Sequence, residues 1–217
     1  IENKAALTDI YPHDEGIERD PSVLYVEKFE ASLRTIQGRY TDVLNPEGMS
    51  LDTDVPPGSK GKYSLKITNT GGQNTGGHLF RNFDPGFDNT IYLRYYVKYP
   101  RISKGYIHHE SVWFGGYEPS TAWPNPQAGT CGLDGRLSIA YEPINNDSIM
   151  GTYLYWSGMH SWNGGSSCYG NDVNHANPQS FNWDKWICIE IMIKMNNPVT
   201  ASNGELQIWQ DGREIGH

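Results

Sequence analysis

Short segments in which apolar and polar residues alternate recur along most of the chain, and turn-forming residues separate them. The alternation is clearest over Ile91–Tyr99, where every second side chain from Ile91 onward is apolar or aromatic. A period of two residues is the pattern of a β-strand with one buried face. The strands predicted in this way are Val23–Phe29, Tyr63–Thr68, His78–Phe83, Ile91–Tyr99, His108–Phe114, Arg136–Glu142, Thr152–Trp156, Trp186–Met195 and Glu205–Trp209.

Helical periodicity is almost absent, and only Glu30–Gln37 is expected to form a short helix. Many short strands separated by turns predict an all-β fold, a β-sandwich or jelly roll. Residues 1–22 are polar and contain Pro12, Gly16 and Pro21, so we expect an irregular lead-in there. No segment in the middle of the chain is typical of a linker, and residues 23–217 are predicted to form a single domain.

The last residues have the pattern of a hairpin. A tight turn over Gln210–Arg213 follows the strand Glu205–Trp209, and a return strand begins at Glu214. The sequence then stops. A hairpin that ends within its second arm predicts that the natural protein continues beyond His217, and that the last strands of the jelly roll are missing here.

Composition excludes several classes of protein. The 217 residues include 17 Lys and Arg and 25 Asp and Glu, so the formal net charge is −8. An acidic chain without a Lys/Arg cluster is not typical of a nucleic-acid binder. No apolar run approaches the roughly 20 residues of a membrane-spanning helix, so no membrane span is expected.

Two of the three cysteines lie in Gly-rich loops, Cys131 in AGTCGLDG and Cys168 in GGSSCYG. In an oxidising compartment they are expected to form a disulfide, and in the cytosol all three thiols would stay reduced. Cys188 lies in the apolar run WICIEIMIKM and is expected to be a small buried residue. A disulfide would place the protein outside the cell or in a periplasm.

Two long loops, Gly115–Asp134 and Ser157–Trp183, interrupt the strand pattern. Loops of this length without secondary structure are usually functional, and we expect these two to wall one cleft. Aromatic side chains in and near them suit stacking on sugar rings, or form the loops' own small core. These residues are Trp113, Tyr117, Trp123, Trp162 and Tyr169.

Three consecutive residues, His108, His109 and Glu110, fall in a predicted strand. Strand geometry would place His108 and Glu110 on one face and His109 on the other. An imidazole beside a carboxylate can act as a base with its orienting partner, or form a structural hydrogen bond. A register shift by one residue would exchange the two histidines.

The strand Arg136–Glu142 is predicted to turn Leu137, Ile139 and Tyr141 toward the core. Its other face, formed by Arg136, Ser138, Ala140 and Glu142, is small and polar, which is typical of a groove that leaves room for a ligand. Arg136 is expected to clamp a carboxylate, or to pair with Asp134 or a loop carbonyl.

Further candidates follow the same alternation. Tyr153 and Tyr155 share one face of a strand, where each can exchange a proton with a ligand, stack on a sugar or cap a core. His160 lies just beyond that strand and is another candidate base. Glu190, which alternates with core isoleucines, is expected to pair with a lysine across the sheet or to act in a hydrolase.

Five segments follow one another in a familiar order: IYLRYYVKYP, HHESVWFGGYEPSTAWPNPQAG, DGRLSIAYEP, WICIEIMIKM and GELQIWQDGREI. Together they resemble concanavalin A-like jelly-roll proteins of the polysaccharide-lyase-like type. The resemblance implies a secreted protein with a cleft on a concave sheet, and cleavage of a uronic-acid-containing glycan by β-elimination. Carried over to this chain, it implies Arg136 or Arg94 as the group that neutralises the carboxylate, His108 or His109 as the base, and Tyr153 or Tyr155 as the acid.

The expected partner is therefore a polysaccharide or oligosaccharide. Residues expected to contact it are Arg94, Trp113, Tyr117, Trp123, Glu142, His160 and Trp162. The chemistry requires no cofactor, and a structural calcium ion is compatible with this architecture. A metal could also be held by His108 and Glu110 together with His160 or His175 from a loop.

Two other functions stay open. A carbohydrate-binding module or lectin would use the same aromatic and polar face without catalysis. A glycoside hydrolase would need two carboxylates roughly 5–10 Å apart, drawn from Glu110, Asp134, Glu142 and Glu190. The ExDxxE pattern of one large family of jelly-roll glucanases is missing, which argues against a hydrolase of that type.

Overall fold

A computed structural model describes most of the 217 residues. The described residues are 7–73, 76–87, 89–101, 109–117, 127–131, 135–144, 148–161, 164–173, 175 and 178–216. The chain divides into two compact units, Ile1–Arg81 and Asn82–His217, and each is described by itself. A single domain over residues 23–217 stays a prediction.

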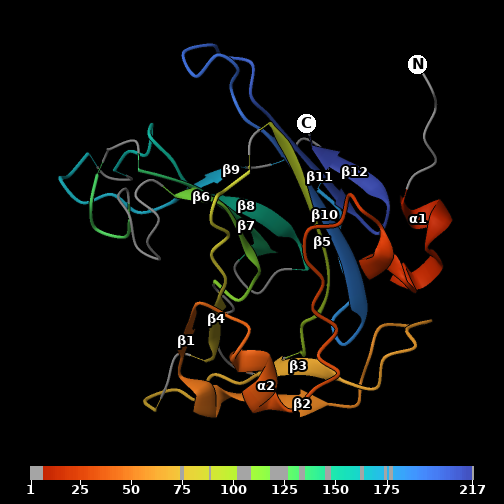
Figure 1. Cartoon of the computed structure of the whole chain (residues 1–217). Coiled ribbons are helices and arrows are strands. Elements are labelled where there is room, and N and C mark those ends of the chain that lie inside the picture. Colours follow the sequence, from red (N-terminus) through yellow and green to blue (C-terminus); the bar gives the residue numbers. More distant parts are fainter. Residues whose placement is uncertain are drawn as a thin grey trace. The chain divides into compact units, whose positions relative to one another are not determined.

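The first unit combines short helical turns with two small antiparallel sheets (Figure 1). β1 pairs with β4, and β2 pairs with β3. Ser32 caps α2, because its hydroxyl accepts a hydrogen bond from the Thr35 backbone N–H. The elements are α1 (Leu7–Ile10), η1 (Pro12–Asp14), η2 (Ile17–Arg19), α2 (Leu33–Gln37), β1 (Asp42–Leu44), η3 (Pro46–Gly48), β2 (Met49–Asp52), β3 (Ser64–Ile67) and β4 (His78–Phe80).

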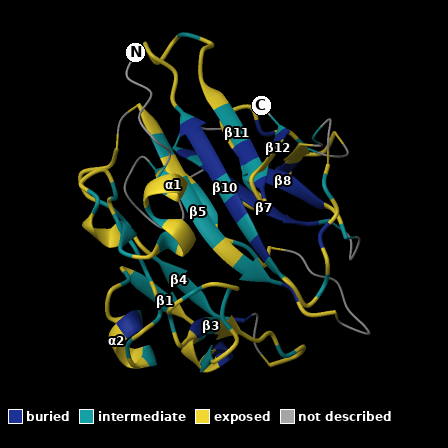
Figure 2. Ribbon diagram, turned by 90° about the vertical axis from the view of Figure 1, so that its right-hand side faces the viewer, coloured by how far each residue is buried: buried dark blue, intermediate teal, exposed yellow. Residues whose placement is uncertain are grey.

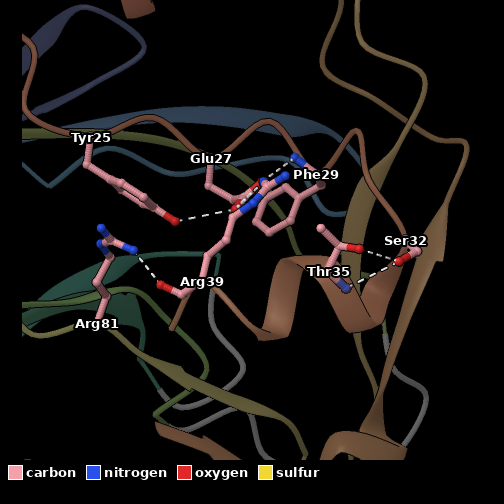
Figure 3. A network of polar contacts seen from close by, with 7 residues as sticks. All are labelled: Tyr25, Glu27, Phe29, Ser32, Thr35, Arg39 and Arg81. Carbon is pink, nitrogen blue, oxygen red and sulfur yellow. Dashed lines mark hydrogen bonds and ion pairs between the residues drawn. The ribbon is translucent and has the colours of Figure 1, made fainter. Parts of the chain in front are cut away.

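A polar network around Glu27 lies in the first unit (Figure 3). The Glu27 side chain is 6% exposed, and its two carboxylate oxygens accept hydrogen bonds from Arg39 Nη1 at 2.9 and 3.0 Å. The same carboxylate accepts from the Phe29 backbone N–H at 2.9 Å and from the Tyr25 hydroxyl at 3.3 Å. Arg81 places its guanidinium over the Tyr25 ring, 4.3 Å from the ring centroid. Glu27 therefore connects a segment without regular structure to the chain that follows α2.

The predicted strand Val23–Phe29 is wrong, since these residues form neither a helix nor a strand. Phe29 has a φ of 58°, in the left-handed region, which a strand cannot continue through. Its N–H binds the Glu27 side chain instead of a neighbouring strand. The Glu27 carboxylate here takes the place of the neighbouring strand that the alternating pattern predicted as the hydrogen-bond partner.

The second unit is formed by two four-stranded antiparallel sheets, with strand orders β12-β11-β10-β5 and β6-β7-β8-β9 (Figure 1). The strands are β5 (Thr90–Lys98), β6 (Trp113–Tyr117), β7 (Arg136–Pro143), β8 (Met150–Tyr155), β9 (Asn171–Val173), β10 (Trp186–Lys194), β11 (Glu205–Gln210) and β12 (Arg213–Gly216).

One apolar cluster lies between these two sheets. β10 contributes Ile187, Ile189, Ile191 and Ile193, and β7 contributes Ile139 and Tyr141 from the other sheet. Figure 2 shows the burial that results along β7, β8 and β10. The predicted all-β sandwich is confirmed, as is the alternation along β5, β7 and β10.

The hairpin β11–β12 has the predicted tight turn. Asp211 and Gly212 both have positive φ, 50° and 77°, as a two-residue hairpin loop of this type requires. The Asp211 carboxylate also accepts a hydrogen bond from the Cys188 backbone N–H at 2.9 Å, which joins the turn to β10. Among the described residues, no helix has the length and hydropathy needed to cross a membrane.

We predict that Glu27→Ala lowers the free energy of unfolding by about 2 kcal/mol, because it removes charge-assisted hydrogen bonds from a nearly buried carboxylate. The matched control is Glu18→Ala. Its ion pair with Lys28 joins side chains that are 41% and 43% exposed, so a clearly smaller loss is expected. Urea denaturation followed by far-ultraviolet circular dichroism measures both. Equal losses in the two variants would contradict a special role for Glu27.

Candidate functional site

One face of the β6-β7-β8-β9 sheet points away from the sandwich core. It carries six of the predicted site residues that the structure describes: Trp113, Tyr117, Arg136, Glu142, Tyr153 and Tyr155. In register, Tyr117 lies opposite Arg136, and Glu142 lies opposite Gly151. One row crosses all four strands and contains Trp113, Ala140, Tyr153 and Asp172. Another row contains Gly115, Ser138 and Tyr155. We call this surface the β7 face.

Arg136 is surrounded by aromatic rings on the β7 face and is only 8% exposed. Its Cζ lies 4.2 Å from the centroid of the Tyr155 ring, 5.7 Å from that of Tyr117 and 5.8 Å from that of Trp113. Its Nε donates a hydrogen bond to the Ser138 hydroxyl at 2.7 Å. Burial lowers the pKa of Arg136, while Tyr117 and Tyr155 oppose that shift. A guanidinium stays charged in proteins, so the site holds a cation stabilised by ring faces.

The room predicted above the small residues of β7 is filled by the chain's own rings. Ser138 and Ala140 are both 0% exposed. Their neighbours in register are Trp113 and Tyr153 beside Ala140, and Tyr155 beside Ser138. Large side chains on the flanking strands cover the small ones on β7. The expectation of an open groove over β7 is therefore wrong.

His109 lies just before β6 and joins the β7 face from the side. Its Nδ1 lies 3.2 Å from Glu142 Oε1. Its ring centroid is 4.6 Å from that of Tyr153 and 5.5 Å from that of Trp113. The His109 side chain is 37% exposed, whereas that of Glu142 is 5% exposed. This pair therefore has a buried carboxylate and an imidazole that solvent and ligands can reach.

Two expectations about the HHE segment need revision. His109 has a φ of 62°, and β6 begins only at Trp113, so the alternation predicted for a strand from residue 108 is wrong at His109 and Glu110. The imidazole–carboxylate pair that is described joins His109 to Glu142, which lies 33 residues further along. His108 is outside the described residues, as are Trp123, Asp134 and Trp162.

Glu110 is solvent-exposed, but part of the hydration of its carboxyl is removed by the surrounding chain. Desolvation raises the pKa of Glu110, and the negative charge of Glu142 raises it further. The β7 face therefore has an acidic edge beside His109.

Tyr153 and Tyr155 are 6% and 7% exposed, and their ring centroids lie 5.6 Å apart. Burial is the largest cause that raises the pKa of Tyr153, and interaction with Tyr155 adds to it. A hydrogen bond from the Gly170 backbone acts in the opposite direction. Tyr153 therefore keeps its proton at neutral pH, as an ordinary tyrosine does, and its raised pKa makes it a weaker acid than an exposed tyrosine.

The predicted disulfide between Cys131 and Cys168 is confirmed. Cys168 packs in a second apolar cluster with Met159, Tyr153, Tyr155 and Trp113, so the disulfide lies directly beside the β7 face. Cys188 is outside the disulfide and is half-buried, not buried as predicted, because the alternation along β10 turns it away from the core.

Other candidates lie away from this face. Arg94 forms an ion pair with Glu190 at 2.8 Å on the outer face of the opposite sheet, so Glu190 pairs with an arginine and not with the expected lysine. His160 is exposed beyond β8, and its Nδ1 lies 3.5 Å from the Gly158 carbonyl oxygen. His175 contacts the Thr152 hydroxyl and the ring of Tyr141, a core residue. Within the described part of the chain, no three His, Cys, Asp or Glu side chains gather to hold a metal.

Gly170 and Asp172 belong to the β7 face but were not predicted. Gly170 is buried, and a Cβ built on it would lie 2.2 Å from Tyr153 Cε1. Asp172 lies opposite Tyr153 in the ladder between β8 and β9. β9 spans only three residues, too few for a period of two to stand out, so nothing in the local sequence indicated it.

Comparisons with family models, with curated proteins and with solved structures find no match for this chain.

We predict that Glu110→Gln raises the free energy of unfolding near pH 7 and that this gain disappears near pH 4. The sign follows from linkage. A carboxyl whose pKa is raised on folding binds its proton more tightly in the folded state, so its penalty is absent in acid and appears as the pH rises. Urea denaturation of both proteins at the two pH values measures the difference. A gain of equal size at both would show that the carboxylate charge is not its cause.

Proposed function

We propose that this chain is a polysaccharide lyase that cleaves a uronic-acid-containing glycan by β-elimination at the β7 face. The observation that carries the proposal is the contact between His109 and Glu142, beside Tyr153 and on the face that holds Arg136. These are a base with its orienting carboxylate, a proton donor and a cation, the three kinds of group that elimination requires.

His109 is the proposed base. An ionised carboxylate only accepts hydrogen bonds, so Glu142 favours the tautomer with a proton on Nδ1 of His109. Nε2 then carries the lone pair of the ring. The partly exposed imidazole is in a position to take a proton from a glycan at the rim of the β7 face, while Glu142 stabilises the imidazolium that forms.

The proposed step conserves atoms and electrons. His109 Nε2 takes the proton from C5 of the uronate, and the C5–H electron pair forms a double bond between C4 and C5. The bond between C4 and the glycosidic oxygen breaks, and that oxygen takes the proton of the Tyr153 hydroxyl. Arg136 lowers the barrier by stabilising the negative charge that develops on the uronate carboxylate.

Charge limits how such a substrate would arrive. The chain carries a net charge of −8, and Glu110, Glu142 and Asp172 lie on or beside the β7 face. Long-range attraction of a polyanion is therefore weak. Binding would rest on short-range contact with Arg136 and on stacking against ring edges, with Trp113 and Tyr117 the nearest described aromatics.

A secreted location is part of the proposal. The Cys131–Cys168 disulfide supports it, because disulfides persist in oxidising compartments. The proposed reaction uses no cofactor, and a structural calcium ion stays a prediction.

A glycoside hydrolase is the second candidate, and the interaction between Glu110 and Glu142 favours it. The pKa of Glu110 is raised, first by desolvation and then by Glu142, as expected for an acid beside an ionised carboxylate. In this alternative Glu110 would protonate the leaving oxygen and Glu142 would act as the base or nucleophile.

The test incubates the chain with a panel of uronans and neutral glucans, and follows reducing ends together with the ultraviolet absorbance of an unsaturated uronate. We expect both signals to rise with a uronan. His109→Ala should lower the rate by about a hundredfold or more, the size of a lost general base. His13→Ala, at an exposed histidine of the first unit, is the control and should keep the full rate.

Other results would contradict the lyase. Reducing ends without the absorbance would establish hydrolysis and direct attention to Glu110 and Glu142. Retention on an immobilised glycan without any product would leave a binding module. Full elimination by His109→Ala would remove His109 as the base.

A further inference from the structure

The segment that precedes β9 packs against Tyr153, and a disulfide ties this segment to a neighbouring loop. Cys168, at its start, is 2% exposed and packs with Tyr153, Tyr155 and Met159. The disulfide ties it to Cys131, and its carbonyl oxygen accepts a hydrogen bond from the Gly129 N–H at 2.6 Å. The segment is thus fixed to the neighbouring loop by a covalent bond and a backbone hydrogen bond.

Two residues further on, Gly170 lies flat against the phenol ring. A Cβ on Gly170 would lie 2.2 Å from Cε1 of Tyr153, 2.5 Å from Cζ and 2.8 Å from Cδ1. Real Cβ atoms essentially never approach heavy atoms within 3.0 Å. Glycine is therefore required here by space, since any side chain would push the ring away from its place on the β7 face.

The same residue reaches the reactive oxygen of that ring. Among the causes that set the pKa of Tyr153, a hydrogen bond from the Gly170 backbone lowers it, so this backbone lies within reach of the hydroxyl oxygen. When a phenol gives up its proton, negative charge develops on this oxygen, and an N–H donor already aimed at it stabilises that charge without reorganisation. Asp172, opposite Tyr153 in the ladder, acts in the other direction because its charge is negative.

We propose that Gly170, held by the Cys131–Cys168 disulfide, is a positioning residue that fixes the Tyr153 ring and stabilises the charge on its oxygen during proton donation. The catalytic part rests on the proposed function, since it takes Tyr153 as the acid. The positional part does not, and amide hydrogen exchange tests it without a substrate.

In the first measurement, the Gly170 amide is followed by hydrogen exchange in the full chain. Tyr153→Phe keeps the ring and removes the acceptor oxygen, so we expect exchange at Gly170 to become about tenfold faster or more. The double variant Cys131→Ser/Cys168→Ser should accelerate it similarly. Tyr92→Phe, which removes the hydroxyl of a 70% exposed tyrosine in β5 of the other sheet, is the control and should change it by less than about twofold.

The second measurement is elimination by Gly170→Ala. We expect kcat to fall by about tenfold or more with little change in KM, because the lost interaction belongs to the transition state. Gly116→Ala is the matched control, since a Cβ at Gly116, in β6 at the opposite edge of the same sheet, meets nothing within 4 Å.

The outcomes separate the two proposals. Unchanged exchange at Gly170 in Tyr153→Phe overturns the positioning role, whatever the activity. Faster exchange in a chain that eliminates no uronan supports the positioning of Tyr153 and overturns the lyase. Faster exchange together with full elimination by Gly170→Ala overturns the catalytic part of the inference alone.

Discussion

Burial of Ile139 and Tyr141 between the two sheets is the constraint on which the candidate site depends. Both side chains are at most 2% exposed and pack against the isoleucines of β10. Because neighbouring side chains of a strand point to opposite faces, this burial turns Arg136, Ser138, Ala140 and Glu142 to the other side. A slip of one residue would move all four into the apolar core, where the buried Arg136 and Glu142 would lose the rings and polar groups that now stabilise them.

The aromatic rings then determine what the β7 face can do. Trp113, Tyr153 and Tyr155 stand over the small residues of β7 and exclude water from around Arg136. Electrostatic interactions are stronger in such surroundings. A cation that has already lost part of its hydration loses little more of it when a carboxylate approaches. Among the described residues of and beside this face, His109, Glu110 and Asp172 are more open to solvent than Arg136, Tyr153 and Tyr155, so we expect chemistry at the rim of the face and not in a deep cleft.

The sequence predicted those parts of this arrangement that depend on the alternation of residues within one strand. A period of two residues identified β5, β7 and β10, and it separated the two faces of β7 correctly. It could not indicate the left-handed backbone at His109 or the contact of His109 with Glu142, because each depends on chain distant in sequence. It predicted a strand over Val23–Phe29, because alternation says nothing about whether a partner strand exists. The filling of the β7 face depends on which residues of the flanking strands come into register, and no single segment contains that information.

The tautomer of His109 tests the account most directly, because the whole arrangement acts through this imidazole. Nitrogen-15 NMR of the full chain, at a pH where the ring is neutral, distinguishes its two nitrogens. If Glu142 orients the ring, the proton is on Nδ1, Nε2 has the shift of a bare lone pair, and Glu142→Gln weakens this preference. A proton on Nε2, or a tautomer unaffected by Glu142→Gln, would contradict the assignment of His109 as a base oriented by Glu142.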